Sequence, residues 1–180
     1  MIVKKATEDW EFEQIFKLNY STFVEEIPQH PANEEKKLKD KFHEVNEYII
    51  AVNHNEVLGM ICINDKRPFS LDKKLENIEK YLPEAKKIVE IRLLSVKKEA
   101  RGSLIFFNLF NHIRSVCFEK GYDLAIISGT VLQERLYKKI GFIPFAHKVG
   151  TDKALYQPMY LTWEALDEYL TKIEDQIELS

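Results

Sequence analysis

Residues 88–120 read IVEIRLLSVKKEARGSLIFFNLFNHIRSVCFEK, and this stretch decides the fold. Its opening segment, Ile88–Val96, is rich in β-branched and aliphatic side chains, which predicts a buried strand. Beyond the polar residues 97–102, apolar side chains recur at spacings of three and four, which predicts a helix over residues 103–120. A second buried strand is expected at residues 124–127. The stretch therefore predicts a βαβ unit whose two strands are parallel.

The chain before this unit is expected to supply more strands and two helices. The first strand is predicted at Ile2–Val3, and a helix capped by Asp9 follows it. A charged helix is predicted over residues 33–43. Two apolar stretches, residues 48–52 and 57–63, are separated by a short polar turn and predict a β-hairpin.

A long segment, residues 64–87, separates this hairpin from the central strand. Ser70 is expected to cap a helix within it, with Leu71, Leu75 and Ile78 on one side. A hairpin connection is normally only a few residues long, so the segment is a large insertion. Two interpretations stay open: a lid or wall of a pocket, or a helix that covers a sheet edge.

After the βαβ unit, Leu132, Leu136 and Ile140 predict a short helix with these side chains on its buried face. The last strands are expected at residues 142–146 and 155–163, as an antiparallel pair followed by a C-terminal helix. The element order predicts an α/β (α+β) fold. Its central sheet is mixed and mostly antiparallel, with the parallel βαβ unit at its core and helices on its flanks.

Composition limits the classes of function. The 180 residues fit a single domain over residues 1–180, and 45% are apolar, enough for a sizeable core. The formal charge of −3 gives no field that attracts nucleic acid. No stretch reaches the roughly 20 apolar residues that cross a bilayer. Cys62 and Cys117 are expected to be reduced core residues, which suits the cytoplasm. The scattered histidines predict no metal site.

The junction from Val96 to Ser103, VKKEARGS, joins a buried strand to a helix N-terminus. Free backbone N–H groups and the helix dipole make such a junction suitable for a pyrophosphate. Lys97, Lys98 and Arg101 add positive charge. The alternative is an ordinary βα loop that carries surface cations.

Tyr137 lies in the second segment of interest, Leu-Tyr-Lys-Lys-Ile-Gly-Phe at residues 136–142. It follows Leu136 of the apolar stripe, so its side chain is expected to point sideways toward a cleft. A tyrosine hydroxyl can donate a proton to a leaving thiolate. The alternative is a half-buried tyrosine on a helix flank.

Together, residues 96–103 with the helix after them and residues 136–142 resemble the core of the GNAT (GCN5-related N-acetyltransferase) superfamily. The resemblance implies the GNAT acyltransferase fold and an acyl-phosphopantetheine donor, acetyl-CoA or another acyl-CoA. It is weaker toward the autoinducer-synthase and N-acyl amino acid synthase branch, which also uses acyl carrier protein. That branch is suggested by Phe23-Val-Glu-Glu, by the large insertion, and by Val89-Glu-Ile-Arg-Leu-Leu-Ser-Val.

The resemblance also implies donor-binding residues. The pantetheine arm would pair with backbone groups of Leu94, Ser95 and Val96, and the Leu94 N–H would polarise the thioester carbonyl. The phosphate loop would comprise Arg101, Gly102, Ser103 and Leu104. The family loop usually has small residues where this chain has Leu104 and Phe106, and small residues let the backbone approach phosphate closely.

The resemblance implies two catalytic residues. Tyr137 would protonate the leaving thiolate, and Glu90 would take a proton from a small-molecule amine, with Glu25 and Glu26 as alternatives. For Glu90 an ion pair with a nearby lysine or arginine is the competing interpretation. The expected function is N-acyl transfer to a primary amine. The alternative is an inactive ligand-binding or regulatory module of the same fold. The last strands and the C-terminal helix could also pair with a second copy.

Overall fold

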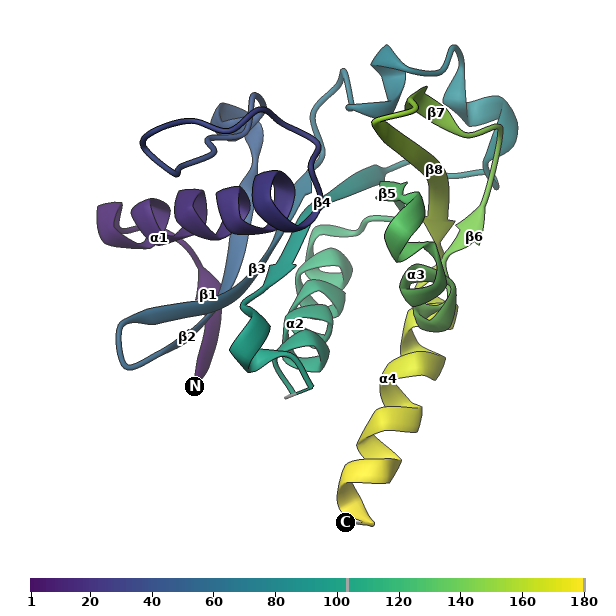
Figure 1. The fold of residues 1–180 in the computed structure, drawn as a ribbon. Coiled ribbons are helices and arrows are strands. Elements are labelled where there is room, and N and C mark those ends of the chain that lie inside the picture. Colours follow the sequence, from purple (N-terminus) through teal and green to yellow (C-terminus); the bar gives the residue numbers. More distant parts are fainter. Residues whose placement is uncertain (103, 180) are drawn as a thin grey trace. The chain divides into compact units, whose positions relative to one another are not determined.

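The computed structural model describes residues 1–102 and 104–179, and the chain forms two compact units (Figure 1). Unit 1 comprises Met1–Asn64 and Arg92–Ile113, and unit 2 comprises Asp65–Ile91 and the chain from Arg114 onward. Strand β4 (Ile88–Val96) therefore gives its first residues to unit 2 and its last to unit 1. The single domain expected for residues 1–180 stays a prediction.

In unit 1 the strands of the sheet follow the order β1-β2-β3-β4, and the pairs β1–β2 and β2–β3 are antiparallel. Its strands β1 (Ile2–Lys5), β2 (Glu47–Asn53) and β3 (Glu56–Asn64) follow the predicted strands closely. The β2–β3 turn has positive φ at both His54 and Asn55, 46° and 60°. Such a turn matches the twist of the strands it joins, so the predicted hairpin is confirmed.

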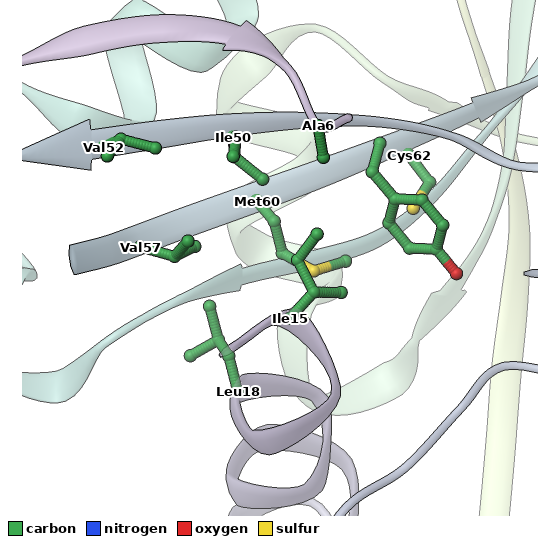
Figure 2. Packing of buried hydrophobic residues seen from close by; sticks show 9 residues of the cluster. Ala6, Ile15, Leu18, Ile50, Val52, Val57, Met60 and Cys62 are labelled. Carbon is green, nitrogen blue, oxygen red and sulfur yellow. The ribbon is translucent and has the colours of Figure 1, made fainter. Parts of the chain in front are cut away.

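Helix α1 (Asp9–Tyr20) covers this sheet. Figure 2 shows Ile15 and Leu18 of α1 pointing toward the buried side chains of β2 and β3. The prediction that Asp9 caps the helix is wrong, because Glu8 is the capping residue. The fully buried Glu11 side chain accepts from the amides of Thr7 and Glu8, at 2.8 and 3.0 Å.

A π-helix, Ser21–Glu26, continues α1 directly. The helix predicted over residues 33–43 is wrong, and only a short 3₁₀ turn, His43–Val45, lies at its end. Lys36 has a left-handed φ of 51°, which an α-helix does not accommodate. Asn33 closes a local turn instead: its side-chain amide nitrogen donates to the Lys37 carbonyl at 2.9 Å.

Unit 2 contains the parallel pair. Ile88, Val89 and Glu90 of β4 pair with Leu124, Ala125 and Ile126 of β5 (Leu124–Thr130). The next strand, β8 (Ala154–Leu161), is antiparallel to β5 and also pairs with β6 (Ile143–Pro144) and β7 (Val149–Thr151). The predicted parallel βαβ unit and the antiparallel final strands are confirmed.

The three α-helices that follow β4 in the described residues each lie close to their predicted positions. They are α2 (Ile105–Lys120), α3 (Glu134–Ile140) and α4 (Trp163–Glu178). Gly121 and Gly141 follow α2 and α3 with φ of 66° and 111°, the conformation that ends a helix. The mixed α/β fold class is confirmed. Within residues 1–102 and 104–179, no helix combines the length and apolar character that a membrane span requires.

The insertion, residues 64–87, does not form the predicted helix. It makes two short 3₁₀ turns, Leu71–Lys73 and Ile78–Tyr81, because Asn77 between them has a φ of 50°. The predicted apolar side is nevertheless buried. Leu71, Leu75 and Ile78 pack in one cluster with Ile126 of β5 and with Phe145 and Val149. The insertion is therefore part of the core of unit 2.

Candidate functional site

A backbone irregularity interrupts β4 just before the predicted arm-binding residues. Leu93 has a φ of +52°, which is rare for a branched side chain inside a strand. An irregularity of this kind changes the direction of the backbone groups that follow it. It thus sets the orientation of Leu94, Ser95 and Val96.

Leu94 and Ser95 are buried, and the side chain of Ser95 has a structural partner. Its hydroxyl shares a hydrogen bond with the hydroxyl of Thr22 in the π-helix. Gly59 of β3 lies very close to this part of β4. A Cβ at Gly59 would lie 3.2 Å from the Val96 side chain and 2.9 Å from that of Ile105. The absent side chain therefore permits β3, β4 and α2 to pack tightly in unit 1.

A 3₁₀ turn, Lys98–Ala100, directly precedes Arg101, the first residue of the predicted phosphate loop. Gly102 has a φ of 84°, which glycine adopts at no steric cost. Leu104 is 47% exposed. The prediction for Ser103 lies outside the described residues.

Arg101 is held on both sides of its guanidinium. Its Nε donates to the Val96 carbonyl at 3.0 Å, and its Nη2 lies 2.9 and 2.8 Å from the two carboxylate oxygens of Glu26. Lys97 also has a partner, since its Nζ lies 2.5 Å from Glu56. Two of the three cations expected to add positive charge at this loop are thus paired with carboxylates.

A cavity of about 250 Å³ lies beside the loop in unit 1. It is lined by polar and charged side chains of α1, the π-helix and the loop, with one leucine: Gln14, Lys17, Leu18, Ser21, Glu26, Lys97, Lys98 and Glu99.

Glu90, the predicted base, is fully buried on β4 in unit 2. Both of its carboxylate oxygens accept from the Ser70 amide at 3.1 Å, and the Ser70 hydroxyl donates to one of them. Ser70 is the N-cap residue of the 3₁₀ turn Leu71–Lys73, as predicted in position, but its side chain makes no capping hydrogen bond because its hydroxyl is directed to Glu90. Ser70 is a partner that the sequence interpretation missed, since nothing in their separation along the chain signals the contact.

Tyr137, the predicted acid, lies on α3 and is only 8% exposed. Its hydroxyl donates to Gln133 Oε1 at 3.3 Å. Its ring covers Gly129 of β5, where a Cβ would lie 3.0 Å from two ring carbons. Burial raises the pKa of the Tyr137 hydroxyl well above its ordinary value, so this group keeps its proton at neutral pH.

The expected orientation of α3 is wrong. Leu132 and Leu136 were expected on its buried face, but they are 77% and 36% exposed. The buried side chains are Tyr137 and Ile140, which are three positions apart and share one face. A 3₁₀ turn, Val131–Gln133, precedes α3 and sets a different helical phase from the one expected.

A buried ion pair in unit 1 is a second feature that the sequence interpretation missed. Arg92 Nη2 donates to both carboxylate oxygens of Asp40, at 2.9 and 3.0 Å, and both side chains are 11% exposed. Asp40 also accepts from Asn46 at 2.8 Å, and the Arg92 guanidinium lies 4.3 Å from the centre of the Phe42 ring. The helix expected over residues 33–43 concealed this arrangement.

The predicted site residues thus divide between the units. Glu90 and Tyr137 are both positioned through β5 in unit 2, by pairing with Ile126 and by packing on Gly129. The predicted donor-binding residues that the structure describes all belong to unit 1: Leu94, Ser95, Val96, Arg101, Gly102 and Leu104.

Comparison with known proteins identifies the family. Residues 12–142 match the Acetyltransferase (GNAT) family, and this range includes β4, its irregularity, the loop after it and α3. The chain belongs to the GNAT acetyltransferase family. The resemblance inferred from the loop and from residues 136–142 is confirmed, and so is the GNAT fold. A search of curated proteins finds no match.

Solved structures with this GNAT fold include acyl-transfer enzymes of the branch suggested by the sequence. One is a CoA-dependent acyl-homoserine lactone synthase, BjaI, with SAM and isopentyl-CoA. Its TM-score is 0.75 at 17% identity, covering 96% of this chain and 88% of that chain. Another is FeeM, an N-acyl amino acid synthase from uncultured soil microbes. Its TM-score is 0.70 at 15% identity, covering 94% and 99%.

A third match is a putative N-acetyltransferase from Lactobacillus plantarum. Its TM-score is 0.65 at 15% identity, covering 90% of this chain and 97% of that chain. At these identities the GNAT fold is what the proteins share.

Proposed function

We propose that this chain is an N-acyltransferase that moves an acetyl or longer acyl group from CoA, or from acyl carrier protein, to a small-molecule primary amine. The observation that carries the proposal is the family match over residues 12–142, which includes both segments assigned to chemistry. The acyl-transfer enzymes among the matching structures support it.

In unit 1, the segment Leu94–Val96 would bind the pantetheine arm through its backbone. The left-handed Leu93 supports this role, because it directs the backbone groups that follow it. The Leu94 N–H would donate to the thioester carbonyl oxygen as negative charge develops there. Ser95 would contribute its backbone alone, since its hydroxyl is engaged by Thr22.

In unit 2, Tyr137 would donate its proton to the thiolate as the carbon–sulfur bond breaks. Its hydroxyl carries the proton at neutral pH, but burial raises its pKa and so makes it a weaker acid. Glu90 would accept a proton from the attacking amine, directly or through water. The hydrogen bonds that Ser70 donates hold the Glu90 carboxyl group in place.

A non-catalytic module of the same fold is the second candidate. It is favoured by the loop, where Arg101 is paired with Glu26 and the exposed Leu104 stands where the family usually has a small residue. Such a module would bind an acyl thioester without transferring its acyl group.

Turnover with two donors tests the proposal. Purified protein is incubated with acetyl-CoA or octanoyl-CoA and a panel of primary amines, and release of free thiol is measured. We expect amine-dependent thiol release with at least one donor. If calorimetry detects donor binding but no amine gives thiol release, the non-catalytic module is the better description. Acyl carrier protein donors are tested in the same way.

A further inference from the structure

The contact between Arg101 and Glu26 is unusual for an arginine expected to bind phosphate. Nη2 of Arg101 is within hydrogen-bonding distance of both Glu26 oxygens, at 2.9 and 2.8 Å. The Glu26 side chain is only 17% exposed, whereas that of Arg101 is 44% exposed. The carboxylate is thus the better shielded member of the pair.

Glu26 is held in place by its own backbone. It ends the π-helix Ser21–Glu26, and the next amide, that of Ile27, donates to the Thr22 carbonyl at 2.8 Å. The Thr22 hydroxyl in turn bonds that of Ser95 on β4. Two side-chain links therefore join the π-helix to β4 and its loop. The Glu26 carboxylate is consequently presented to Arg101 by an ordered frame.

Carboxylate and phosphate compete for the same donors of an arginine. A carboxylate is planar and a phosphate is tetrahedral, but each presents two anionic oxygens that the guanidinium can bind through paired N–H groups. A phosphate that approaches Arg101 must displace Glu26 and then remain near its negative charge. Each of these effects weakens binding of a donor that depends on its phosphates.

We propose that Glu26 is a donor-specificity residue that competes with the diphosphate of the donor for Arg101. The inference rests on the proposed function, because it concerns the same donor site. Its consequence is that the arm and the acyl chain supply most of the donor affinity. Donors with long acyl chains retain the most affinity, since burial of apolar surface adds affinity independently of the phosphates.

Binding measurements on Glu26→Gln test the proposal without requiring turnover. Calorimetry compares octanoyl-CoA with S-octanoyl-pantetheine, which has the same acyl chain and thiol arm but lacks the phosphates. We expect octanoyl-CoA to bind Glu26→Gln about tenfold more tightly than the wild type, since a partly shielded unit charge near phosphate has an effect of this order. The affinity for S-octanoyl-pantetheine should not change.

Two further variants test whether the gain in octanoyl-CoA affinity comes from releasing Arg101. Glu99→Gln removes one negative charge two positions from Arg101, at an exposed residue of the same loop, and should leave octanoyl-CoA affinity within about twofold. Adding Arg101→Gln to Glu26→Gln should abolish the gain. Glu26→Ala provides the same test if the glutamine variant is not stable.

The inference is overturned if the octanoyl-CoA affinity of Glu26→Gln equals that of the wild type, including the case in which neither binds. It is also overturned if Glu99→Gln gives the same gain, because the effect would then be general electrostatics. A tighter variant without turnover would retain this inference and reject the acyltransferase function. Turnover by the wild type, together with an unchanged octanoyl-CoA affinity of Glu26→Gln, would support the acyltransferase function and overturn this inference.

Discussion

The Ser70 amide donates to both carboxylate oxygens of Glu90, at 3.1 Å each, and the Ser70 hydroxyl donates to the same carboxylate. Glu90 is fully buried, and burying a polar group is costly unless hydrogen bonds compensate for its lost hydration. The insertion, residues 64–87, thereby supplies a partner to the central strand of the sheet.

Ser70→Ala is expected to destabilise the protein by about 2 kcal/mol, the usual scale for losing a hydrogen bond to a buried charge. The free energy of unfolding is measured by urea denaturation. Ser128→Ala is the matched control: its hydroxyl accepts from Lys74 at 3.0 Å in an exposed setting, so the change should stay within about 0.5 kcal/mol. Equal effects of the two variants would contradict the role assigned to Ser70.

Tyr137→Phe is expected to lower turnover by one to a few factors of ten while leaving stability nearly unchanged, roughly the range for loss of acid–base assistance. The ring remains packed over Gly129 and against Phe142, so only the hydroxyl and its bond to Gln133 are lost. Steady-state kinetics and thermal unfolding are measured together. Tyr169→Phe on α4 is the control, and wild-type turnover of Tyr137→Phe would exclude the acid role.

Asp40→Asn is expected to destabilise the protein by about 3 kcal/mol, because it removes the negative charge from an ion pair whose two side chains are each only 11% exposed. Urea denaturation again gives the free energy of unfolding. The matched control is Glu44→Gln, which breaks an exposed pair with Lys39 at 3.6 Å and should cost less than about 0.5 kcal/mol. A small loss in Asp40→Asn would mean that this pair contributes little to unit 1.

His43 predicts a pH dependence of stability. Burial lowers the pKa of this histidine, and Lys39 lowers it further. Its Nδ1 lies 3.1 Å from the Tyr48 hydroxyl, and its ring packs edge-on against Phe12 and Phe16. The folded-state pKa is thus below the unfolded value of about 6.5. As the pH falls below the unfolded-state pKa, the unfolded chain binds more protons than the folded protein. The free energy of unfolding therefore decreases until the pH has also passed the folded-state pKa.

We therefore expect the free energy of unfolding to fall between pH 7 and pH 5, and His43→Phe to reduce that slope. His30 adds to the slope, because burial lowers its pKa as well. Chemical denaturation at several pH values measures it. A His43→Phe profile parallel to that of the wild type would show that His43 does not contribute.

Periodicity located most regular elements because their patterns are local. The β-branched and aliphatic side chains of Ile88–Val96 predicted β4, and the apolar stripe over residues 103–120 predicted α2. Charged and polar segments were less informative. Residues 33–43 have a composition typical of a helix, but Lys36 adopts a left-handed φ and Asp40 is directed to Arg92 on β4. A contact across 52 positions overrides local propensity there.

The candidate site likewise has features that the sequence predicted and contacts that it did not. The motif at residues 136–142 identified Tyr137 from sequence, but its burial depends on Gly129 and on a 3₁₀ turn that changes the phase of α3. Arg101 was also identified from sequence. Its pairing with Glu26 was not, because the two residues are 75 positions apart and meet only through the fold.

The sequence by itself determined the family, the parallel βαβ unit and the positions of the two segments assigned to chemistry. Each of these depends on residues that are near one another in the chain, where spacing translates directly into backbone geometry. The tertiary structure alone decided the partners of the charged side chains: Ser70 for Glu90, Asp40 for Arg92 and Glu26 for Arg101. Burial and hydrogen bonding in the folded chain determine these partners, and their separation along the sequence does not predict them.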